Sequence, residues 1–265
     1  MNLLLIEASE AVESEGKLCV TLEDERARHL REVLRVVPGQ FVRAGIINGP
    51  RGHAEVLSCA QGKVSLRLEC TEPPLPPPPL EVVMALPRPR VLAQVVQSAV
   101  ELGVAAIHLV GTERVERAYF GSHLLRDDAL RHLLLKALAQ AGDTRLPQLS
   151  IHRSLSAWLK HFKPTPQTLY VLAEREAPAS FLDVLGCSSQ GQAMVAIGPE
   201  GGFTERERKE LLAAGFVEAN LGQRVLRVET AMIAALVIGH AVLSKRLPRG
   251  GEALQCCFPP KEAIR

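Results

Sequence analysis

Two glycine-containing motifs in the C-terminal half of the chain have the residue types of a ligand-binding site. The first, residues 193–204, reads Ala-Met-Val-Ala-Ile-Gly-Pro-Glu-Gly-Gly-Phe-Thr, so an apolar run ends at a turn that holds one carboxylate, Glu200. The second, residues 221–231, reads Leu-Gly-Gln-Arg-Val-Leu-Arg-Val-Glu-Thr-Ala and precedes a long apolar stretch. Glycines leave space for a ligand to approach backbone N–H and C=O groups closely. Together the two motifs predict a cofactor site.

For the first motif alone, an ordinary strand-to-helix turn without a ligand is the alternative interpretation, because Gly and Pro mark tight turns. The second motif favours ligand binding. Neither a Gly-x-Gly-x-x-Gly fingerprint nor a P-loop is present at the turn, and the turn holds no lysine. The expected ligand is therefore small, mostly neutral or zwitterionic, and held by backbone groups.

The pattern around the first motif predicts the elements that position it. Residues 193–197 suit a buried parallel strand, and Thr204 with Glu207 three residues later has the pattern of a capping box at a helix start. Upstream, apolar runs alternate with helical patterns: strands at 82–86, 106–110 and 168–173, and helices at 91–102 and 128–141. This alternation predicts an α/β domain with a parallel sheet.

Polar segments directly follow the predicted strands. They are residues 87–90, 111–114, 174–176, 198–202 and 222–224. Ligands of open α/β sheets bind at the carboxyl ends of the strands. We therefore expect these segments to meet at one edge of the sheet and to form the site.

A proline-rich segment marks a domain boundary. Residues 72–79 read Glu-Pro-Pro-Leu-Pro-Pro-Pro-Pro, which suits a stiff polyproline spacer and neither a helix nor a central strand. Before it, β-favouring runs are separated by Gly and Asn-Gly turns, which predicts a small barrel; the runs are 3–6, 18–22, 41–47, 53–59 and 64–69. The predicted organisation is a barrel at 1–72, a linker at 73–79, an α/β domain at 80–247 and a tail at 248–265.

Composition limits the classes of protein and site. A chain of 265 residues with 47% hydrophobic content suits one large and one small domain. The apolar stretch 231–243 is too short to span a bilayer, and the N-terminus has no basic region with a cleavage site, so a cytoplasmic protein without a membrane partner is expected. The six cysteines form no Cys-x-x-Cys pair, and His-Glu-x-x-His is absent, so no metal site is predicted.

A basic segment in the N-terminal part indicates an RNA contact. The net charge is only +2, but between residues 26 and 53 basic side chains outnumber acidic ones. A solvated surface diluted by the acidic residues 23–25 is the alternative. A helix is predicted at 26–36, with Leu30, Val33 and Leu34 on its apolar face.

With these motifs in place, the chain resembles the ribosomal RNA uridine N3-methyltransferases of the SPOUT superfamily over nearly its whole length. The weaker matching segments are 29–35 with Pro38-Gly39, 101–104 and 112–114. The specific segments are Ile-Gly-Pro-Glu-Gly-Gly-Phe at 197–203 and Leu-Gly-x-Arg-Val-Leu-Arg-x-Glu-Thr-Ala at 221–231.

The resemblance implies an architecture, a cofactor and partners. It implies a PUA-like RNA-binding β-barrel followed by a SPOUT α/β domain with a deep trefoil knot. It also implies S-adenosylmethionine as methyl donor, 16S ribosomal RNA or the small subunit as substrate, and a homodimer. The apolar helix expected at 229–245 independently favours dimerisation, with full burial inside one chain as the alternative.

The resemblance also implies site residues. Those expected to bind S-adenosylmethionine are Leu172, Ala173, Glu174, Ile197, Gly198, Pro199, Glu200, Gly201, Gly202, Leu221, Gly222, Arg224, Val225, Leu226, Thr230 and Ala231. For RNA, the resemblance favours a contact by Arg114. His29, Arg31 and Arg35 fall on or near one face of the predicted helix and are expected to contact the RNA backbone.

Methylation of uridine N3 requires removal of its proton. Glu200 is the candidate base, since it projects from the turn at the expected catalytic edge; its alternative role is to accept hydrogen bonds from neighbouring N–H groups. Arg227 is the candidate for stabilising negative charge on the base or holding a phosphate, and its alternative is an ion pair with Glu229. A base in folded RNA must be extruded to react. With 4% aromatic residues, stacking of bases on aromatic side chains is not predicted.

Two departures from the family pattern concern the RNA nucleotide that accepts the methyl group. Gln97-Ser98 stands where the family commonly has a lysine, and residues 139–142 read Ala-Gln-Ala-Gly instead of the usual Glu-Gln-Ser/Cys-x. Both segments are expected near the RNA side of the site. They favour, as an alternative function, a SPOUT methyltransferase that acts on another RNA nucleotide. A non-catalytic RNA-binding assembly factor is a further alternative, against which the intact glycines and Arg227 argue.

Overall fold

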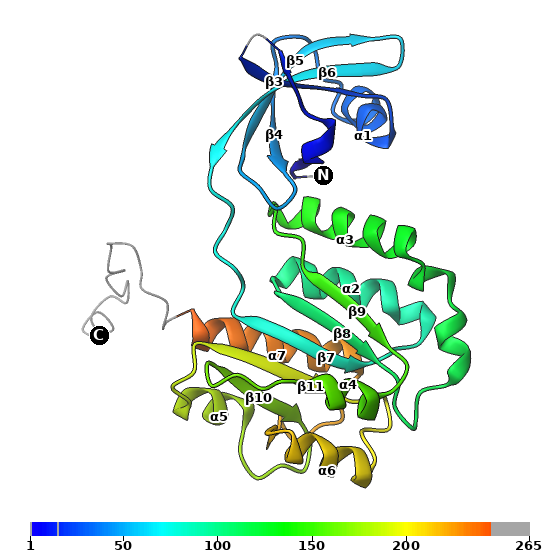
Figure 1. Cartoon of the computed structure of the whole chain (residues 1–265), viewed down its shortest axis with the longest axis vertical. Coiled ribbons are helices and arrows are strands. Elements are labelled where there is room, and N and C mark those ends of the chain that lie inside the picture. The colour runs from blue at the N-terminus through cyan, green and yellow to red at the C-terminus, as the bar shows by residue number, and fades with distance from the viewer. Residues whose placement is uncertain (1, 15, 245–265) are drawn as a thin grey trace, which may run out of the picture.

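The computed structural model describes residues 2–14 and 16–244, and in this part of the chain the strands form two six-stranded sheets (Figure 1). The N-terminal sheet has the order β1-β4-β5-β6-β3-β2. Its strands are β1 (Leu4–Ile6), β2 (Val12–Ser14), β3 (Lys17–Leu22), β4 (Phe41–Ile46), β5 (Arg51–Ala60) and β6 (Lys63–Glu72). Apart from the parallel pair β1–β4, neighbouring strands are antiparallel. The five strands predicted before the proline-rich segment are confirmed, and β2 was not predicted.

The N-terminal sheet has its own core because apolar residues alternate along its strands. In β6, Val64, Leu66 and Leu68 are buried and alternate with more exposed residues, as the two-residue period of a strand requires. Gln61 and Gly62 both have positive φ and connect β5 to β6 in a tight hairpin. Hydrophobic burial on one face therefore fixes the register of this sheet.

The helix predicted at 26–36 is wrong in length and in its apolar face. The chain forms a short α1 (Glu25–Arg28), capped by the Asp24 side chain, and then a π-helical turn at His29–Val33. Leu30 is buried, but Val33 is 65% exposed and Leu34 is 43% exposed. The wider π turn removes the three- and four-residue alignment of an α-helix. Arg35, with φ of 51°, lies beyond the helix.

The C-terminal sheet is parallel throughout and has the order β12-β10-β11-β7-β8-β9. Its strands are β7 (Leu80–Ala85), β8 (Ala106–Val110), β9 (Gln148–His152), β10 (Thr168–Ala173), β11 (Gln192–Ile197) and β12 (Val217–Ala219). Its helices are α2 (Pro89–Leu102), α3 (Asp127–Ala141), α4 (Leu155–His161), α5 (Phe181–Cys187), α6 (Glu205–Ala213) and α7 (Val228–Leu243). The predicted parallel α/β arrangement is confirmed.

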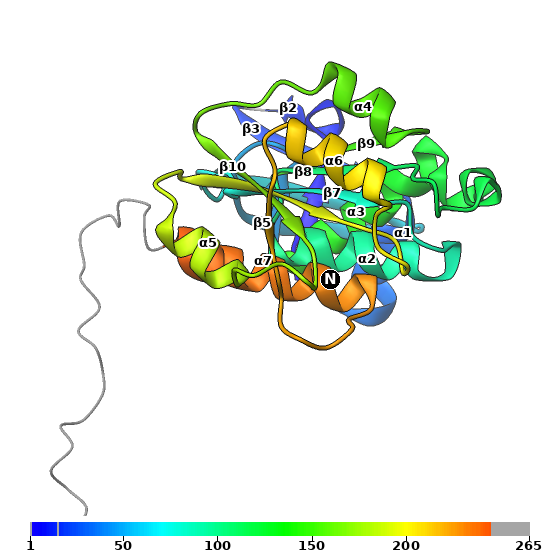
Figure 2. The ribbon, with the colours of Figure 1, turned by 90° about the horizontal axis from the view of Figure 1, so that it is seen from below.

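Helices cover both faces of the parallel sheet (Figure 2). One core lies between the sheet and α2, α3, α5 and α7, and a second lies between the sheet and α4 and α6. In β10, Val171 faces the first core, whereas Tyr170 and Leu172 face the second. Near-continuous apolar strands such as β11 follow from this burial on two faces.

The two sheets are joined by packing as well as by the proline-rich segment. Residues 73–79 form no helix or strand and run as an extended connection in Figure 1. Strand β1 contributes to both sides: Leu4 and Ile6 lie in the N-terminal core, whereas Leu5, with the preceding Leu3, lies in the core beneath α2 and α3. The backbone N–H of Leu3 donates to the carbonyl of Ala139, at 3.0 Å. Alternation along one strand thus ties the two sheets together.

Candidate active site

A cavity of about 570 Å³, here called the larger cavity, lies at the carboxyl edge of the parallel sheet. Three segments line most of it: residues 173–176 after β10, 197–203 after β11, and 221–226 after β12. They are close because parallel strands end at one edge. Its volume lies within the roughly 300–1,000 Å³ of small-molecule sites.

The turn after β11 is shaped by its glycines. Gly202 has φ of 74°, and its N–H donates to the carbonyl of Pro199 at 2.7 Å. A Cβ atom added to Gly198 would lie 3.0 Å from the backbone nitrogen of Phe203. Phe203 itself is buried in the core under α6. The buried side chain of Phe203 thus fixes the end of the turn, and its backbone leaves no room for a side chain at Gly198, where the turn begins.

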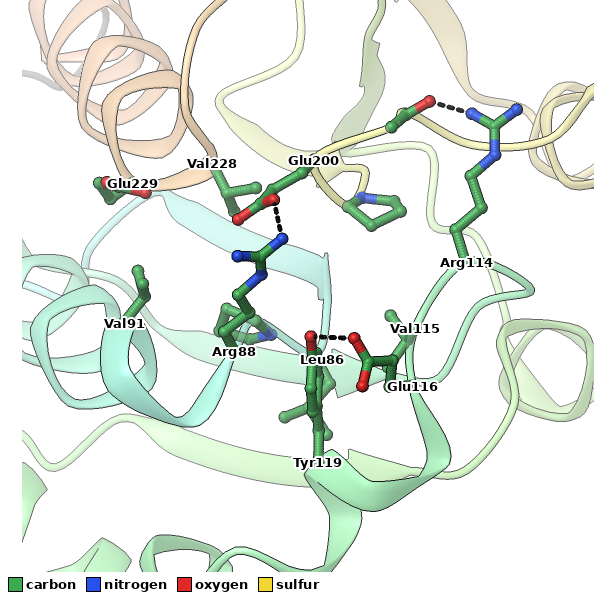
Figure 3. A pocket seen from close by; sticks show the side chains of 13 residues that line it. Leu86, Arg88, Val91, Arg114, Val115, Glu116, Tyr119, Glu200, Val228 and Glu229 are labelled. Carbon is green, nitrogen blue, oxygen red and sulfur yellow. Dashed lines mark hydrogen bonds and ion pairs between the residues drawn. The ribbon is translucent and has the colours of Figure 1, made fainter.

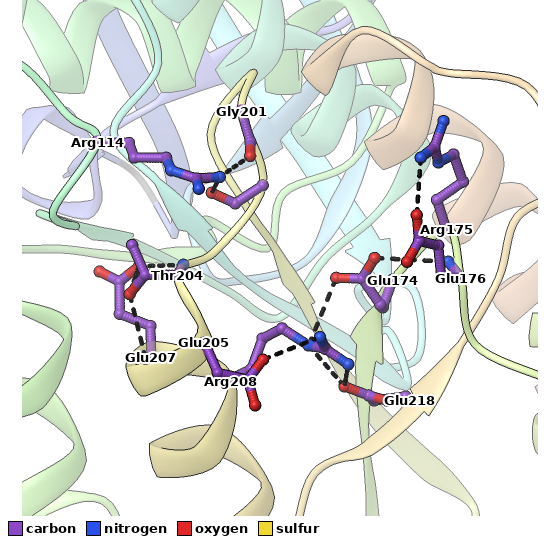
Figure 4. Close-up of polar contacts among 11 residues, drawn as sticks. Arg114, Glu174, Arg175, Glu176, Gly201, Thr204, Glu205, Glu207, Arg208 and Glu218 are labelled. Atoms are coloured by element: carbon purple, nitrogen blue, oxygen red, sulfur yellow. Dashed lines mark hydrogen bonds and ion pairs between the residues drawn. The ribbon is translucent and has the colours of Figure 1, made fainter.

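Glu207 and Arg114 connect this turn to the loop after β8 (Figure 4). The predicted capping box between Thr204 and Glu207 is confirmed. The Glu207 carboxylate, only 2% exposed, also accepts from the backbone N–H of Glu113 at 2.8 Å. The Arg114 guanidinium donates to the carbonyls of Gly201 and Gly202. Arg114 therefore braces the turn; its predicted RNA contact stays a prediction.

The turn after β12 is held by Asn220. The Asn220 amide donates to the carbonyls of Ala177 and Ala179, at 2.8 and 2.9 Å, and its oxygen accepts from the N–H of Gly222. Gly222 has φ of 111°, in the region that favours glycine. The loop then runs over the cavity and ends at the start of α7. The sequence did not predict this role of Asn220, because a single Asn after a short strand belongs to no recognisable motif.

Arg208, which the sequence did not single out, connects the loop after β10 (residues 173–176) to α6. Arg208 donates to Glu218 at 2.6 and 2.9 Å, and its guanidinium lies 3.8 Å from Glu174 (Figure 4). The hydrogen bond with Glu218 raises the pKa of Arg208. This cluster holds Glu174 at the wall of the larger cavity. The sequence indicates only that Arg208 lies in a surface helix. It does not predict the contacts with Glu218 and Glu174.

Most residues predicted to bind the cofactor line the larger cavity. They are Ala173, Glu174, Ile197, Gly198, Pro199, Glu200, Gly201, Gly202, Leu221, Gly222, Arg224, Val225, Leu226 and Ala231. The side chain of Leu172 is instead fully buried in the core under α6, because alternate residues of a strand face opposite sides. Thr230 is exposed on α7 and is not part of the cavity wall.

Arg227 lies outside both cavity walls and directly precedes α7. Its side chain is exposed, and within residues 2–14 and 16–244 it makes no ion pair or side-chain hydrogen bond. The alternative of an ion pair with Glu229 is therefore not observed.

A smaller cavity of about 230 Å³, drawn in Figure 3, shares part of its wall with the larger one. Arg114, Pro199, Glu200, Gly201 and Val228 line both cavities. The remaining wall consists of Leu86, Pro87, Arg88, Val91, Val115, Glu116, Tyr119 and Glu229.

Two polar pairs face each other in the smaller cavity. The Arg88 guanidinium and the Glu200 carboxylate form an exposed ion pair at 2.6 Å. The Tyr119 hydroxyl donates to Glu116 at 2.8 Å. This hydrogen bond raises the pKa of Tyr119, with the nearby Arg88 acting in the opposite direction. Glu200, the predicted base, is thus paired with an arginine in the free protein.

The predicted RNA-contacting residues fall into two places. His29, Arg31 and Arg35 lie together in the N-terminal part, although not on one helical face: the first two are half-buried in the π turn and Arg35 is exposed beyond it. Arg114 lies at the cavities. The structure therefore brings three of the four together and separates the fourth.

The segment 139–142 lies away from both cavities, and its expected place near the RNA stays a prediction. The Ala139 carbonyl accepts from the N–H groups of Asn2 and Leu3, at the contact between the two sheets. Helix α3 starts near the carboxyl edge of the sheet and runs back to the opposite edge, so its last turn is remote from the loops that line the cavities. Gln97, in the middle of α2, is likewise not part of either cavity wall.

No helix in the described part of the chain combines the length and apolar character that crossing a bilayer requires.

Known proteins are similar to this chain in sequence and in fold. Residues 74–239 match the family described as RNA methyltransferase domain. The ribosomal RNA small subunit methyltransferase E of Treponema pallidum is 34% identical over 261 residues, which cover 95% of this chain and 96% of that protein. Ribosomal RNA small subunit methyltransferase E 1 of Borreliella burgdorferi is 27% identical and covers 90% and 97% of the two chains.

Solved structures of similar proteins have the same fold. The crystal structure of ribosomal RNA small subunit methyltransferase E from Neisseria gonorrhoeae, bound to S-adenosyl methionine, matches with a TM-score of 0.74 at 24% identity, covering 91% of this chain and 97% of that one. A Legionella pneumophila structure described as a methyltransferase with bound cofactor SAM also has a TM-score of 0.74 at 24% identity, with 91% and 98% covered. At this identity the likeness shows the fold alone. The full-length match to the Treponema protein goes further and confirms the resemblance drawn from the motifs: this chain belongs to the ribosomal RNA small subunit methyltransferase E family.

Proposed function

We propose that the protein transfers the methyl group of S-adenosylmethionine to N3 of a uridine in 16S ribosomal RNA of the small subunit. The observation that carries the proposal is the pair of adjoining cavities, which share the wall formed by Pro199, Glu200 and Gly201. One cavity has room for a donor and the other for an acceptor, with a carboxylate between them. The names of the relatives above support the reaction type and the RNA.

The residues of the larger cavity fit a donor that is zwitterionic at one end and apolar at the other. Backbone groups at Gly198, Gly201 and Gly222 would hold it, because these positions bring no side chain between the backbone and the ligand. Glu174 and Arg224 offer opposite charges on the same wall. When bound, the donor supplies a methyl group on a positively charged sulfur, which keeps the electron pair of the broken bond.

The acceptor nitrogen must be deprotonated and aligned. The Glu200 carboxylate, on the wall shared by the cavities, accepts the N3 proton, and the N3 electron pair then forms the new bond to carbon. Arg227, exposed and without a partner among the described residues, stabilises the uridine anion or holds a neighbouring phosphate. Because the loops hold both reactants in line, orientation contributes as much as roughly 7–11 kcal/mol in the best cases.

The finer features of the architecture belong to the same proposal. Residues 1–72 are a PUA-like RNA-binding barrel, 73–79 a linker and 80–247 a SPOUT domain; the predicted tail at 248–265 lies outside the described residues. A trefoil knot is supported by the path after β12: from this edge strand the chain returns past β10 to α7, which packs on β11 and β7 near the sheet centre.

Dimerisation through α7 is supported by apolar residues that the single chain leaves uncovered. Val237 on α7 is 49% exposed and Leu182 on α5 is 55% exposed, although α5 and α7 pack together. This is also the reason to prefer a dimer to the alternative of a fully internal helix. A cytoplasmic location is proposed because the small ribosomal subunit is the substrate.

The test uses the purified protein, radiolabelled S-adenosylmethionine and small subunits from a strain that lacks this gene, followed by mapping of the modified nucleotide by mass spectrometry. Label at uridine N3 is the expected result. Label at another nucleotide would refute the acceptor and support a SPOUT methyltransferase with a different target. Donor binding without label on any ribosomal RNA would support a non-catalytic assembly factor instead.

A further inference from the structure

The smaller cavity has features of a nucleobase site that the sequence did not predict. It is separated from the larger cavity by the turn 199–201 and Val228, which line both. Building on the proposed function, we propose that this cavity receives the acceptor pyrimidine, that Tyr119 is the aromatic wall against which the base packs, and that the Arg88–Glu200 pair selects uracil.

The size and lining of the cavity suit a single planar ring. Its volume of about 230 Å³ is below the roughly 300–1,000 Å³ of sites for drug-sized ligands. Leu86, Val91 and Val115 give it apolar sides, and Tyr119 is the one aromatic residue among those that line it. A flat apolar wall next to polar groups is the combination that an extruded base requires.

Tyr119 is held in place as a neutral aromatic surface. It lies in the short 3-10 helix Arg117–Gly121, and its half-buried ring packs against the core. Its hydroxyl donates to Glu116 at 2.8 Å, and this contact raises the pKa of the phenol. The ring therefore stays uncharged at neutral pH with its orientation fixed. Bases stack on such rings through their π faces.

The Arg88–Glu200 pair presents a donor beside an acceptor. Uracil carries an N3–H donor between two carbonyl acceptors, so the carboxylate can accept from N3–H while the guanidinium donates to the adjacent carbonyl. Cytosine has an unprotonated N3 in the same place, which would face the carboxylate with its electron pair. Once a bound base covers the pair, a base that leaves these polar groups unpaired is held less tightly, so the pair discriminates against cytosine.

Binding of the base also prepares Glu200 for its proposed role. In the free protein Arg88 and Glu200 are 60% and 56% exposed and bonded to one another. An exposed ion pair is weak and opens easily. When the base carbonyl takes up the guanidinium, a carboxylate oxygen is released to accept the N3 proton.

The kinetic experiment compares the full-length protein with Tyr119→Ala, Tyr119→Phe and the control Phe120→Leu, using small subunits from the strain that lacks this gene. Phe120 is the next residue and lies under Arg153, outside both cavity walls. We expect Tyr119→Ala to raise KM for subunits about 10- to 100-fold, from the loss of one stacking contact. Tyr119→Phe keeps the ring, so its increase in KM should be several-fold smaller than that of Tyr119→Ala. The control should behave as wild type, and S-adenosylmethionine affinity should be the same in all four.

A second measurement separates the inference from the proposed function. Titration of the wild type with uridine and cytidine 5′-monophosphates, in the presence of S-adenosylhomocysteine and followed by NMR of the protein, should show tighter binding of the uridine nucleotide, weakened by Tyr119→Ala. If this holds but no RNA is methylated, the proposed function fails and the base site stands. An unchanged KM in Tyr119→Ala, a KM effect in Tyr119→Phe as large as in Tyr119→Ala, or equal affinity for the two nucleotides would overturn the inference.

Discussion

The turn after β11 predicts an order of effects among neighbouring glycines. In Gly198→Ala the added methyl group would lie 3.0 Å from the backbone nitrogen of Phe203 and 3.1 Å from its ring. Neither can move freely, because Phe203 is buried in the core. In Gly201→Ala the nearest atom is Cδ of Arg114, at 3.2 Å, and this side chain can swing away. We therefore expect Gly198→Ala to be the more damaging change.

The magnitude follows from the cost of overpacking, which is about 1–3 kcal/mol. If the strain is relieved by opening the turn in the free protein, affinity for S-adenosylmethionine falls by about 5- to 150-fold in Gly198→Ala. In Gly201→Ala the added methyl group points at the movable Arg114 side chain and leaves the backbone groups of the turn in place, so the loss should stay below about fivefold.

Isothermal calorimetry with S-adenosylmethionine measures both affinities, and thermal unfolding of the free proteins checks that they remain folded. Each kcal/mol of strain that stays in the folded state should lower Tm by about 2–4 °C. Wild-type affinity and Tm in Gly198→Ala, or a larger loss in Gly201→Ala, would show that the contact with Phe203 does not control the turn.

Three further changes test other parts of the molecule. Charge reversal of Arg31 and Arg35 should weaken RNA binding and reduce its salt slope by about one unit per residue while sparing donor affinity; an unaltered slope in filter-binding titrations would remove this segment from the RNA footprint. Arg227→Ala should lower kcat without changing Tm, since its exposed side chain has no partner in the described residues; wild-type turnover would end its catalytic role. Burial and the neighbouring His108 lower the pKa of His152 from its usual 6.5, so the unfolded chain binds the proton first as pH falls below 6.5 and stability decreases on acidification. Denaturant titrations should show a smaller decrease for His152→Gln, and an identical pH profile would contradict the assignment.

Strongly patterned segments could be predicted from the sequence. The strand 193–197, the turn that follows it and the capping box at Thr204 are local features, and they place the larger cavity correctly at the carboxyl edge. Short elements such as β2, β9, β12 and α5 lack a long enough period to be recognised. The order of the strands in the sheet depends on contacts distant in sequence, which no local pattern reports.

The smaller cavity shows why some of its lining residues escaped prediction. Tyr119 lies in a 3-10 helix without a glycine motif, and its partner Glu116 is one of many surface acids. Their proposed role depends on Arg88, which lies in the same cavity wall but follows a different strand. The helix predicted at 26–36 failed for a related reason, since a π turn breaks a period that looked helical.

Strand β1 makes the molecule difficult to divide. Its residues enter two cores in turn, and the backbone N–H groups of Asn2 and Leu3 complete the last turn of α3. A truncated chain starting at the linker would keep every residue of both cavities. It would also uncover the apolar side of α3 that faces Leu3 and Leu5, and leave the Ala139 carbonyl without its partners. The N-terminal sheet is therefore not a loosely tethered module: a pull on it is transmitted through Asn2, Leu3 and Leu5 to α3, which belongs to the scaffold that carries the cavities.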